Sequence, residues 1–211
     1  MVKEWRIQEF LDKTASREPT PGGGSIAALV GALSAALSGL VCHYTIGKKK
    51  FKKVEPKVKE LLEKAESLRA KFSDLIQADI DAYEQVSKAY KMPKDTEEEK
   101  RAREIAILRA LKSAINVPME VAKSSFELIR LSWELVKVGN PLLIGDVGCA
   151  AALAVASFES ASLLIEFNLN LINDDELRKE ISPMMDKFSK ECREIYGEIA
   201  EVIRECLRSS S

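Results

Sequence analysis

The stretch from Ile26 to Ile46 contains no Asp, Glu, Lys or Arg and consists mainly of Ala, Gly, Ser and Leu. Within it, Gly31, Ala35 and Gly39 follow one another at intervals of four, a spacing that lets two helices approach closely. An uncharged helix of this length belongs in a protein interior or in a lipid bilayer. Because polar residues dilute its apolarity and we expect no second span of similar quality, the pattern favours a helix buried on all sides, either centrally or across a subunit interface.

The rest of the chain shows the 3.6-residue period of amphipathic helices and lacks the alternation typical of strands. Thr96, followed by three glutamates, is a strong helix start. We expect a restart or kink at Ser182-Pro183 and fraying of the last four to six residues, which end in Ser209 to Ser211. The expected helices cover residues 3–13, 25–46, 57–90, a segment from 96, a segment from about 118 to 139, 146–172 and a segment from 174 onward. The sequence therefore predicts one all-α domain over residues 1–211, a dimeric bundle of about six or seven helices.

Composition narrows the class of protein further. Lys plus Arg is 32 and Asp plus Glu is 33 among 211 residues, so the chain carries no uniform charge for binding nucleic acid. Apolar residues make up 46%, which is enough for a core. The four cysteines are far apart, and the sequence opens Met-Val-Lys-Glu-Trp-Arg without an apolar segment. We expect a cytoplasmic protein without disulfides or a zinc site.

The segment Pro21-Gly22-Gly23-Gly24-Ser25 is the sharpest local motif. Three consecutive glycines predict a strained turn or a ligand lying against the main chain. Ser25 is expected to cap the following helix, whose free N–H groups would favour an anionic or electron-rich group. A dinucleotide site is disfavoured because no strand precedes the glycines. A flexible connector before a buried helix is the alternative.

Four other features are candidates for chemistry or binding. Lysines at 48, 49, 50, 52 and 53 could bind carboxylates or phosphates, or form a solvated helix end. Asp146 precedes an uncharged helix and is either an N-cap or an acid/base. Asp79 is a second carboxylate. His43 is the only histidine, which excludes a multi-histidine metal site within one subunit, and we expect it, like Cys42 and Cys149, to lie in the interior.

Several segments together resemble the formiminotetrahydrofolate cyclodeaminases and the related methenyltetrahydrofolate cyclohydrolases. They are PTPGGGSIAALVGALSAAL from Pro19, TIGKKKF from Thr45, ADIDAY from Ala78, MPKDTEEEKRAR from Met92, Val117-Pro118, Gly139-Asn140, GDVGCAA from Gly145 and FNLNLIND from Phe167. Their order holds from about residue 10 to 174. The resemblance implies an all-α, dimer-forming, cytosolic enzyme of folate one-carbon metabolism and histidine degradation, with a tetrahydrofolate derivative as substrate, no metal and no permanently bound cofactor. Nucleic-acid and membrane partners are not expected.

The resemblance also implies roles for individual residues. Asp146 is the expected catalytic residue, with Asp79 as second candidate. Substrate binding falls to Pro21, Gly22, Gly23, Gly24, Ser25, Asn140 and Asn168, while Lys48 and Lys49 pair with the glutamate carboxylates of a substrate that can be polyglutamylated. The chain departs from the family at Gly145, where a Ser is common, and at Leu164, where an Asn is common. Cyclodeamination is the leading expectation, with cyclohydrolysis or a non-catalytic folate-binding dimer as alternatives.

Overall fold

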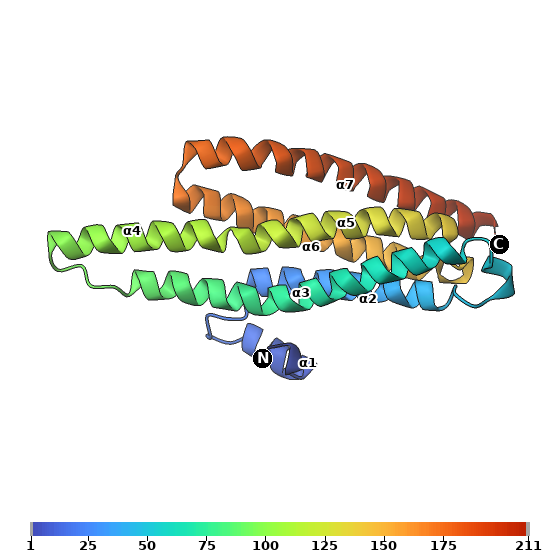
Figure 1. Ribbon diagram of the computed structural model, residues 1–211, viewed down its shortest axis with the longest axis horizontal. Helices are drawn as coiled ribbons and strands as arrows, with labels where there is room; N and C mark the ends of the chain where they lie inside the picture. The colour runs from blue at the N-terminus through green and yellow to red at the C-terminus, as the bar shows by residue number, and fades with distance from the viewer. Residues whose placement is uncertain (1, 210–211) are drawn as a thin grey trace.

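The computed structural model describes residues 2–209, and this part of the chain contains helices and no strand. Seven α-helices run in it as α1 (Ile7–Thr14), α2 (Gly23–His43), α3 (Glu55–Tyr90), α4 (Glu97–Ala114), α5 (Asn116–Val138), α6 (Ile144–Ile172) and α7 (Asp175–Ser209). Three short 3₁₀ helices accompany them, η1 (Val2–Glu4), η2 (Lys49–Phe51) and η3 (Pro141–Leu143). Helices α2 to α7 lie roughly along one axis in an elongated bundle, and the short α1 lies apart on one side of it (Figure 1). The all-α prediction is confirmed.

Helix α2 packs against α3, α5 and α6, and its small residues allow close approach. A side chain at Gly31 would overlap the ring of Phe72, because an added Cβ would lie 2.3 Å from Cε1. Buried serines tie α2 to α6: Ser34 Oγ donates to the Ala150 carbonyl at 2.7 Å, and Ser157 Oγ donates to the Ala27 carbonyl at 2.7 Å. These two bonds show that α2 and α6 run antiparallel.

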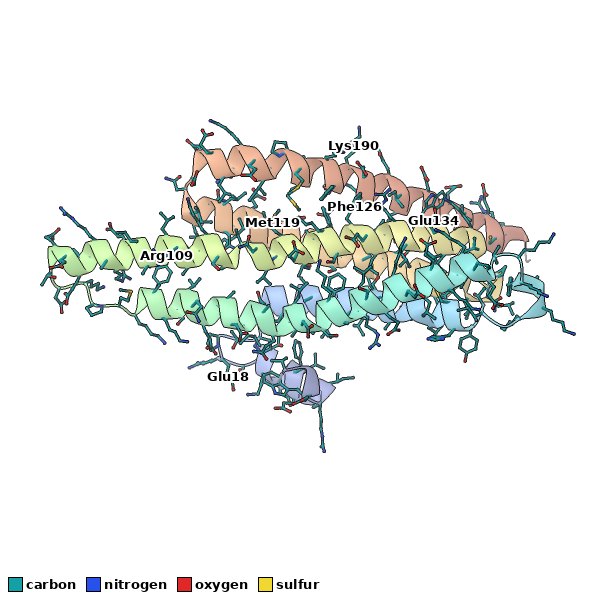
Figure 2. The ribbon with its side chains drawn as sticks, viewed as in Figure 1. Glu18, Arg109, Met119, Phe126, Glu134 and Lys190 are labelled. Carbon is teal, nitrogen blue, oxygen red and sulfur yellow. The ribbon has the colours of Figure 1, made fainter. Side chains whose placement is uncertain are left out.

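Helices α3 and α4 form an arm that continues past the point where α2 begins (Figure 1). Thr96 caps α4 as expected, since its side chain accepts from the Glu99 N–H and the Glu99 side chain accepts from the Thr96 N–H. Helix α5 follows α4 almost end to end, and α7 packs against α5 and α6. In Figure 2, Phe126 of α5 lies toward α7, where its ring stacks on Phe188 at 4.6 Å.

Several local expectations are wrong. Helix α2 begins at Gly23 rather than at Ser25, because Gly22 is its N-cap residue. Helix α7 runs through Pro183, with Ile181 and Met185 buried on either side, so the expected restart is wrong, whereas the alternative of a kink stays a prediction. Cys42 is buried, but Cys149 is exposed. The last two residues, 210 and 211, lie outside the described residues.

The predicted burial of α2 on all sides is also wrong within one subunit, because one side of the helix faces outward. Leu33 is 50% exposed and Leu40 38%, and His43 lies at the end of the same exposed stripe. The neighbouring stripe on α6 exposes Ala156 and leaves Leu163 68% exposed. We call these two exposed stripes together the α2–α6 face.

By length and composition, two segments in the described chain are apolar enough to cross a membrane. They are Gly23–His43, with a mean hydropathy of 2.0, and Pro141–Ile172, with 1.8, so the expectation of a single such stretch is wrong. Both helices pack extensively against each other and against α5. The core helices of soluble proteins have the same composition, so these values alone do not indicate a membrane protein.

Candidate active site

The glycine turn is held by a carboxylate from α3. Asp79 Oδ2 accepts hydrogen bonds from the backbone N–H and from the hydroxyl of Ser25, both at 2.8 Å. Oδ1 lies against Gly24, where an added Cβ would be only 2.0 Å from it. Glycine is therefore required at position 24 by the approach of Asp79. The Asp79 carboxylate therefore already occupies part of the anion-binding site expected at the N-terminus of α2.

Burial raises the pKa of Asp79 above its ordinary value of 3.8, and the two hydrogen bonds from Ser25 oppose that change. Desolvation disfavours the charged carboxylate, whereas donors directed at one oxygen favour it. A carboxyl group with a raised pKa beside a glycine turn is suited to proton transfer. Asp79 thus combines a structural role with the properties of an acid/base.

An apolar cleft lies on the other side of the glycine turn, between the start of α2 and α6. Its volume is about 500 Å³. Gly23 faces α6 there, and an added Cβ would lie 3.7 Å from Leu164. The cleft is lined by Thr14, Pro21, Gly22, Gly23, Ile26, Ser160, Leu163 and Leu164. The resemblance pointed to position 164, but Thr14, Ser160 and Leu163 could not be predicted from the sequence, because no local pattern distinguishes them from ordinary helix-surface residues.

The predicted basic residues lie at the opposite end of α2. Lys48 and Lys49 contribute to a cleft of about 570 Å³, and both are exposed. Lys48 Nζ also lies 5.6 Å from the centre of the Tyr44 ring. The full lining comprises Gly47, Lys48, Lys49, Lys52, Glu55, Pro56 and Lys59. Four lysines against one glutamate give this cleft a positive character suited to carboxylates.

Asn140 lies beside this basic end, and its hydrogen bonds serve the fold. Its N–H donates to Thr45 Oγ1 at 3.0 Å, its side-chain amide donates to the Tyr44 carbonyl at 3.3 Å, and its Oδ1 accepts from the Leu142 N–H at 3.2 Å. The residue therefore joins the end of α2 to the start of η3. The lining of a small cleft with Lys48 and Leu142 also includes Asn140.

Asp146 lies in the first turn of α6, half-buried, and its carboxylate makes no hydrogen bond to any described residue. The side chain is therefore free to act on a substrate. It stands eleven residues before Ser157, the partner of Ala27, which corresponds to roughly 16 Å along the helix axis. Within one subunit, Asp146 consequently lies far from the glycine turn and Asp79.

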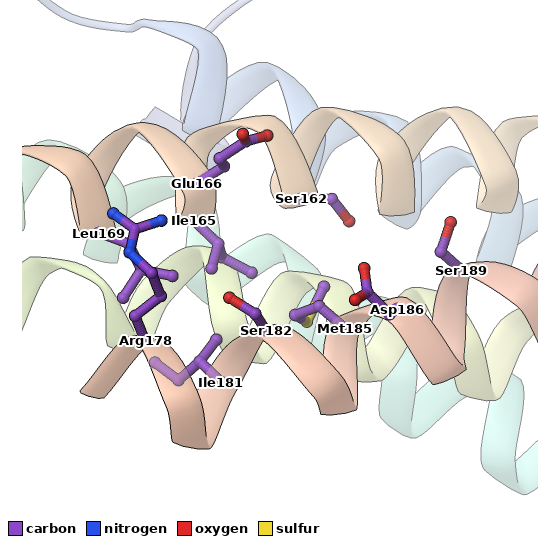
Figure 3. Close-up of a pocket in the computed structure, with 10 residues that line it drawn as sticks. All are labelled: Ser162, Ile165, Glu166, Leu169, Arg178, Ile181, Ser182, Met185, Asp186 and Ser189. Carbon is purple, nitrogen blue, oxygen red and sulfur yellow. The ribbon is translucent and has the colours of Figure 1, made fainter. Parts of the chain in front are cut away.

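The predicted site residues thus form two groups at the two ends of α2. The first contains residues 21–25, Asp79 and Asn168, since Asn168 is one turn beyond Leu164 on α6. The second contains Asp146 together with Lys48, Lys49 and Asn140. A further cleft of about 250 Å³ between α6 and α7 extends from Arg178 to Ser189 and contains none of the predicted residues (Figure 3). Among the described residues, no group of three or more His, Cys, Asp or Glu is placed to hold a metal.

The chain is similar to several known proteins. A family model described as formiminotransferase-cyclodeaminase matches residues 6–187. The methenyltetrahydrofolate cyclohydrolase of Methylorubrum extorquens is 39% identical over 198 residues, which cover 94% of this chain and 95% of that protein. The formimidoyltransferase-cyclodeaminase of Sus scrofa is 29% identical over 187 residues, and the match spans only 35% of its length. The crystal structure of formiminotetrahydrofolate cyclodeaminase from Thermotoga maritima matches with a TM-score of 0.82 and 32% identity, covering 99% of this chain and 98% of that one.

Proposed function

The chain belongs to the formiminotransferase-cyclodeaminase family, and we propose that it makes or opens the one-carbon bridge between N5 and N10 of tetrahydrofolate. The observation that carries the proposal is the Asp79 carboxyl group held at a glycine turn beside an apolar cleft. Such a site offers a surface for a flat ring and a group that can move a proton. The proposed substrate is a tetrahydrofolate derivative, without a permanently bound cofactor.

We infer that cyclohydrolysis, converting 5,10-methenyltetrahydrofolate to 10-formyltetrahydrofolate, is the better supported reaction. The cyclohydrolase from Methylorubrum extorquens is 39% identical along nearly its whole length, compared with 32% for the Thermotoga maritima cyclodeaminase. The short sequence motifs taken alone favour cyclodeamination of 5-formiminotetrahydrofolate. That reaction remains the second candidate because the match to the Thermotoga maritima structure also covers the whole chain.

Both reactions require proton transfer at the same carbon. In cyclohydrolysis, water adds to the methenyl carbon and gives one proton to a base, forming a carbinolamine. The hydroxyl proton then moves to N5 as the bond between N5 and that carbon breaks, so one proton is released overall. In cyclodeamination, N10 attacks the formimino carbon and loses its proton, while the formimino nitrogen gains two protons in all and leaves as ammonia as its bond to that carbon breaks. We assign these transfers to the two carboxyl groups, Asp146 as the first acid/base and Asp79, at the other edge of the substrate, as the second.

We propose that each complete site is built from residues of two copies of the chain, so that a dimer contains two sites. A two-fold axis through the middle of the α2–α6 face would lay α2 and α6 of one subunit across those of the other, with the two copies running in opposite directions. The glycine turn of one subunit would then lie near Asp146 of the partner subunit. The exposed Leu33, Leu40 and Leu163 would be covered by the same contact. Lys48 and Lys49 would meet the glutamate tail, which can be polyglutamylated. A cytoplasmic location stays a prediction.

An absorbance assay for 5,10-methenyltetrahydrofolate tests the proposed reaction. Loss of that chromophore faster than spontaneous hydrolysis, with no activity on 5-formiminotetrahydrofolate, is the expected result. Appearance of the chromophore together with ammonia from the formimino compound would establish the cyclodeaminase instead. Absence of turnover with both compounds would contradict the proposal and leave a folate-binding dimer.

A further inference from the structure

The glycine turn lies between two helices that continue beyond it. On α3, Asp79 contacts Gly24 and Ser25, and on α6, Leu164 faces Gly23. Helix α2 begins at this level, whereas α3 runs on to Tyr90 and α6 to Ile172. Residues four positions further along a helix lie on the same face, about 6 Å along its axis. The next residues past the turn on these two faces are therefore Tyr83 on α3 and Asn168 on α6.

Neither of these side chains makes a hydrogen bond to another described residue. Tyr83 is 45% exposed, and its hydroxyl makes no hydrogen bond there. Asn168 is half-buried, and its amide likewise makes none. Tyr90 lies two turns further along α3 and is 46% exposed, but the Arg103 guanidinium lies 5.6 Å from its ring. Tyr83 and Tyr90 are thus almost equally exposed, but among the described residues only the ring of Tyr90 has a partner.

A free aromatic ring and a free amide beside a glycine turn suit a particular kind of ligand. Tyrosine offers a rigid apolar face for a flat ring, with favourable offset stacking. A carboxamide offers both a donor and an acceptor to the polar edge of a heteroaromatic ring. Ligand sites commonly combine apolar surface with a few such polar groups.

We propose that Tyr83 is a ring-binding residue, whose side chain stacks on a ring of the folate substrate, while Asn168, on the other side of the glycine turn, meets a polar group elsewhere on the same substrate. The inference rests on the proposed function, because the folate supplies the ring. It adds to the glycine turn a recognition element from the arm formed by α3 and α4. The loss of the ring should therefore weaken substrate binding more than it slows the chemical step.

The test compares the variants Tyr83→Leu, Tyr83→Phe and Tyr90→Leu in the full chain. We expect Tyr83→Leu to raise KM by about tenfold with kcat nearly unchanged, the size expected for one lost stacking contact. Tyr83→Phe should restore the wild-type KM, because it keeps the ring. Tyr90→Leu is the matched control and should leave KM unchanged. Titration calorimetry with 5-formyltetrahydrofolate, a non-reacting reduced folate, measures binding independently of turnover.

Two sets of outcomes separate the inference from the proposed function. Wild-type protein that neither binds 5-formyltetrahydrofolate nor turns over either substrate would overturn the proposed function, and this inference with it. Wild-type protein that binds, together with a Tyr83→Leu variant that binds equally well, would overturn the inference alone. Equal losses of affinity in Tyr83→Leu and Tyr90→Leu, or a lower Tm in Tyr83→Leu than in Tyr83→Phe, would show a structural role for the arm and would also overturn it.

Discussion

Asp79 Oδ2 accepts both the backbone N–H and the hydroxyl hydrogen of Ser25, each at 2.8 Å, across a separation of 54 residues. A carboxylate usually caps a helix from the position just before it, but here the capping group comes from another helix. The α2 N-terminus thereby attracts the negative charge of Asp79, and Gly24 leaves the space in which it sits. The glycine turn and the acid/base candidate are one structural unit.

Gly24→Ala should disrupt this unit. The new Cβ would lie 2.0 Å from Asp79 Oδ1, so the carboxylate must move, and we expect a loss of about 1–3 kcal/mol in the free energy of unfolding with near-complete loss of activity. Urea denaturation and the absorbance assay measure the two effects. Gly23→Ala is the matched control for stability, because its Cβ would make an ordinary contact 3.7 Å from Leu164. Equal stability of the two variants would contradict the argument.

Asp79→Asn should separate stability from chemistry. Both hydrogen bonds from Ser25 go to one oxygen, which an asparagine carbonyl can replace, so the variant should fold and lose activity. Burial raises the pKa of Asp79, so the folded protein binds the proton more tightly than the unfolded chain. The free energy of unfolding of the wild type, relative to Asp79→Asn, should therefore rise as pH falls through that raised pKa.

Denaturation curves of the wild type and of Asp79→Asn, measured between neutral pH and about pH 4, check whether the stability difference rises as pH falls. The lower limit lies near the ordinary pKa of an aspartate. Asp79→Ala, which lacks any acceptor, should lose about 1–2 kcal/mol of stability as a missing cap. A difference between wild type and Asp79→Asn that is the same at every pH would show that the carboxyl group does not titrate as described.

Asp146→Asn should lower kcat by about 100-fold or more with little change in KM or Tm, as for a lost acid/base.

If each site combines Asp79 of one subunit with Asp146 of the partner subunit, two inactive variants should complement each other. When Asp79→Asn and Asp146→Asn subunits are dissociated, mixed in equal amounts and reassembled, half of the dimers are mixed. Each mixed dimer has one intact site, so activity should return to about a quarter of wild type. Failure to recover any activity would contradict a site that combines Asp79 of one subunit with Asp146 of the partner subunit.

Leu33→Arg should prevent dimer formation, because it places a charge in the middle of the α2–α6 face. Sedimentation velocity should show a monomer, whereas Ile105→Arg, a control at an exposed position on α4, should stay dimeric. Thiol labelling gives a second readout, since the exposed Cys149 should react in the monomer and be protected in the dimer. Burial raises the pKa of Cys42 to about 11 and that of Cys192 to about 12, so neither should contribute, and the labelling is done in a Cys206→Ser background because Cys206 is only partly buried. A wild-type protein that sediments as a monomer would contradict the assembly.

The sequence by itself determined the local structure of this protein. The helical period, the Thr96 capping box and the three glycines each act over a few neighbouring residues, so their consequences can be predicted from the order of residues along the chain. The resemblance to the cyclodeaminase family depended on the same short segments. Even there, the start of α2 shifted to Gly23, because Asp79 rather than Ser25 provides the side-chain cap.

The tertiary structure decided which of these local features meet. Asp79 and Ser25, 54 residues apart, are joined because α3 packs along α2, while Asp146 is kept at the other end because α6 runs antiparallel to α2. His43 and Cys149 are exposed since the side of the helix that faces outward is set by neighbouring helices, not by local composition. Helix formation depends on short-range hydrogen bonds, whereas the site depends on long-range packing, which the order of residues does not reveal locally.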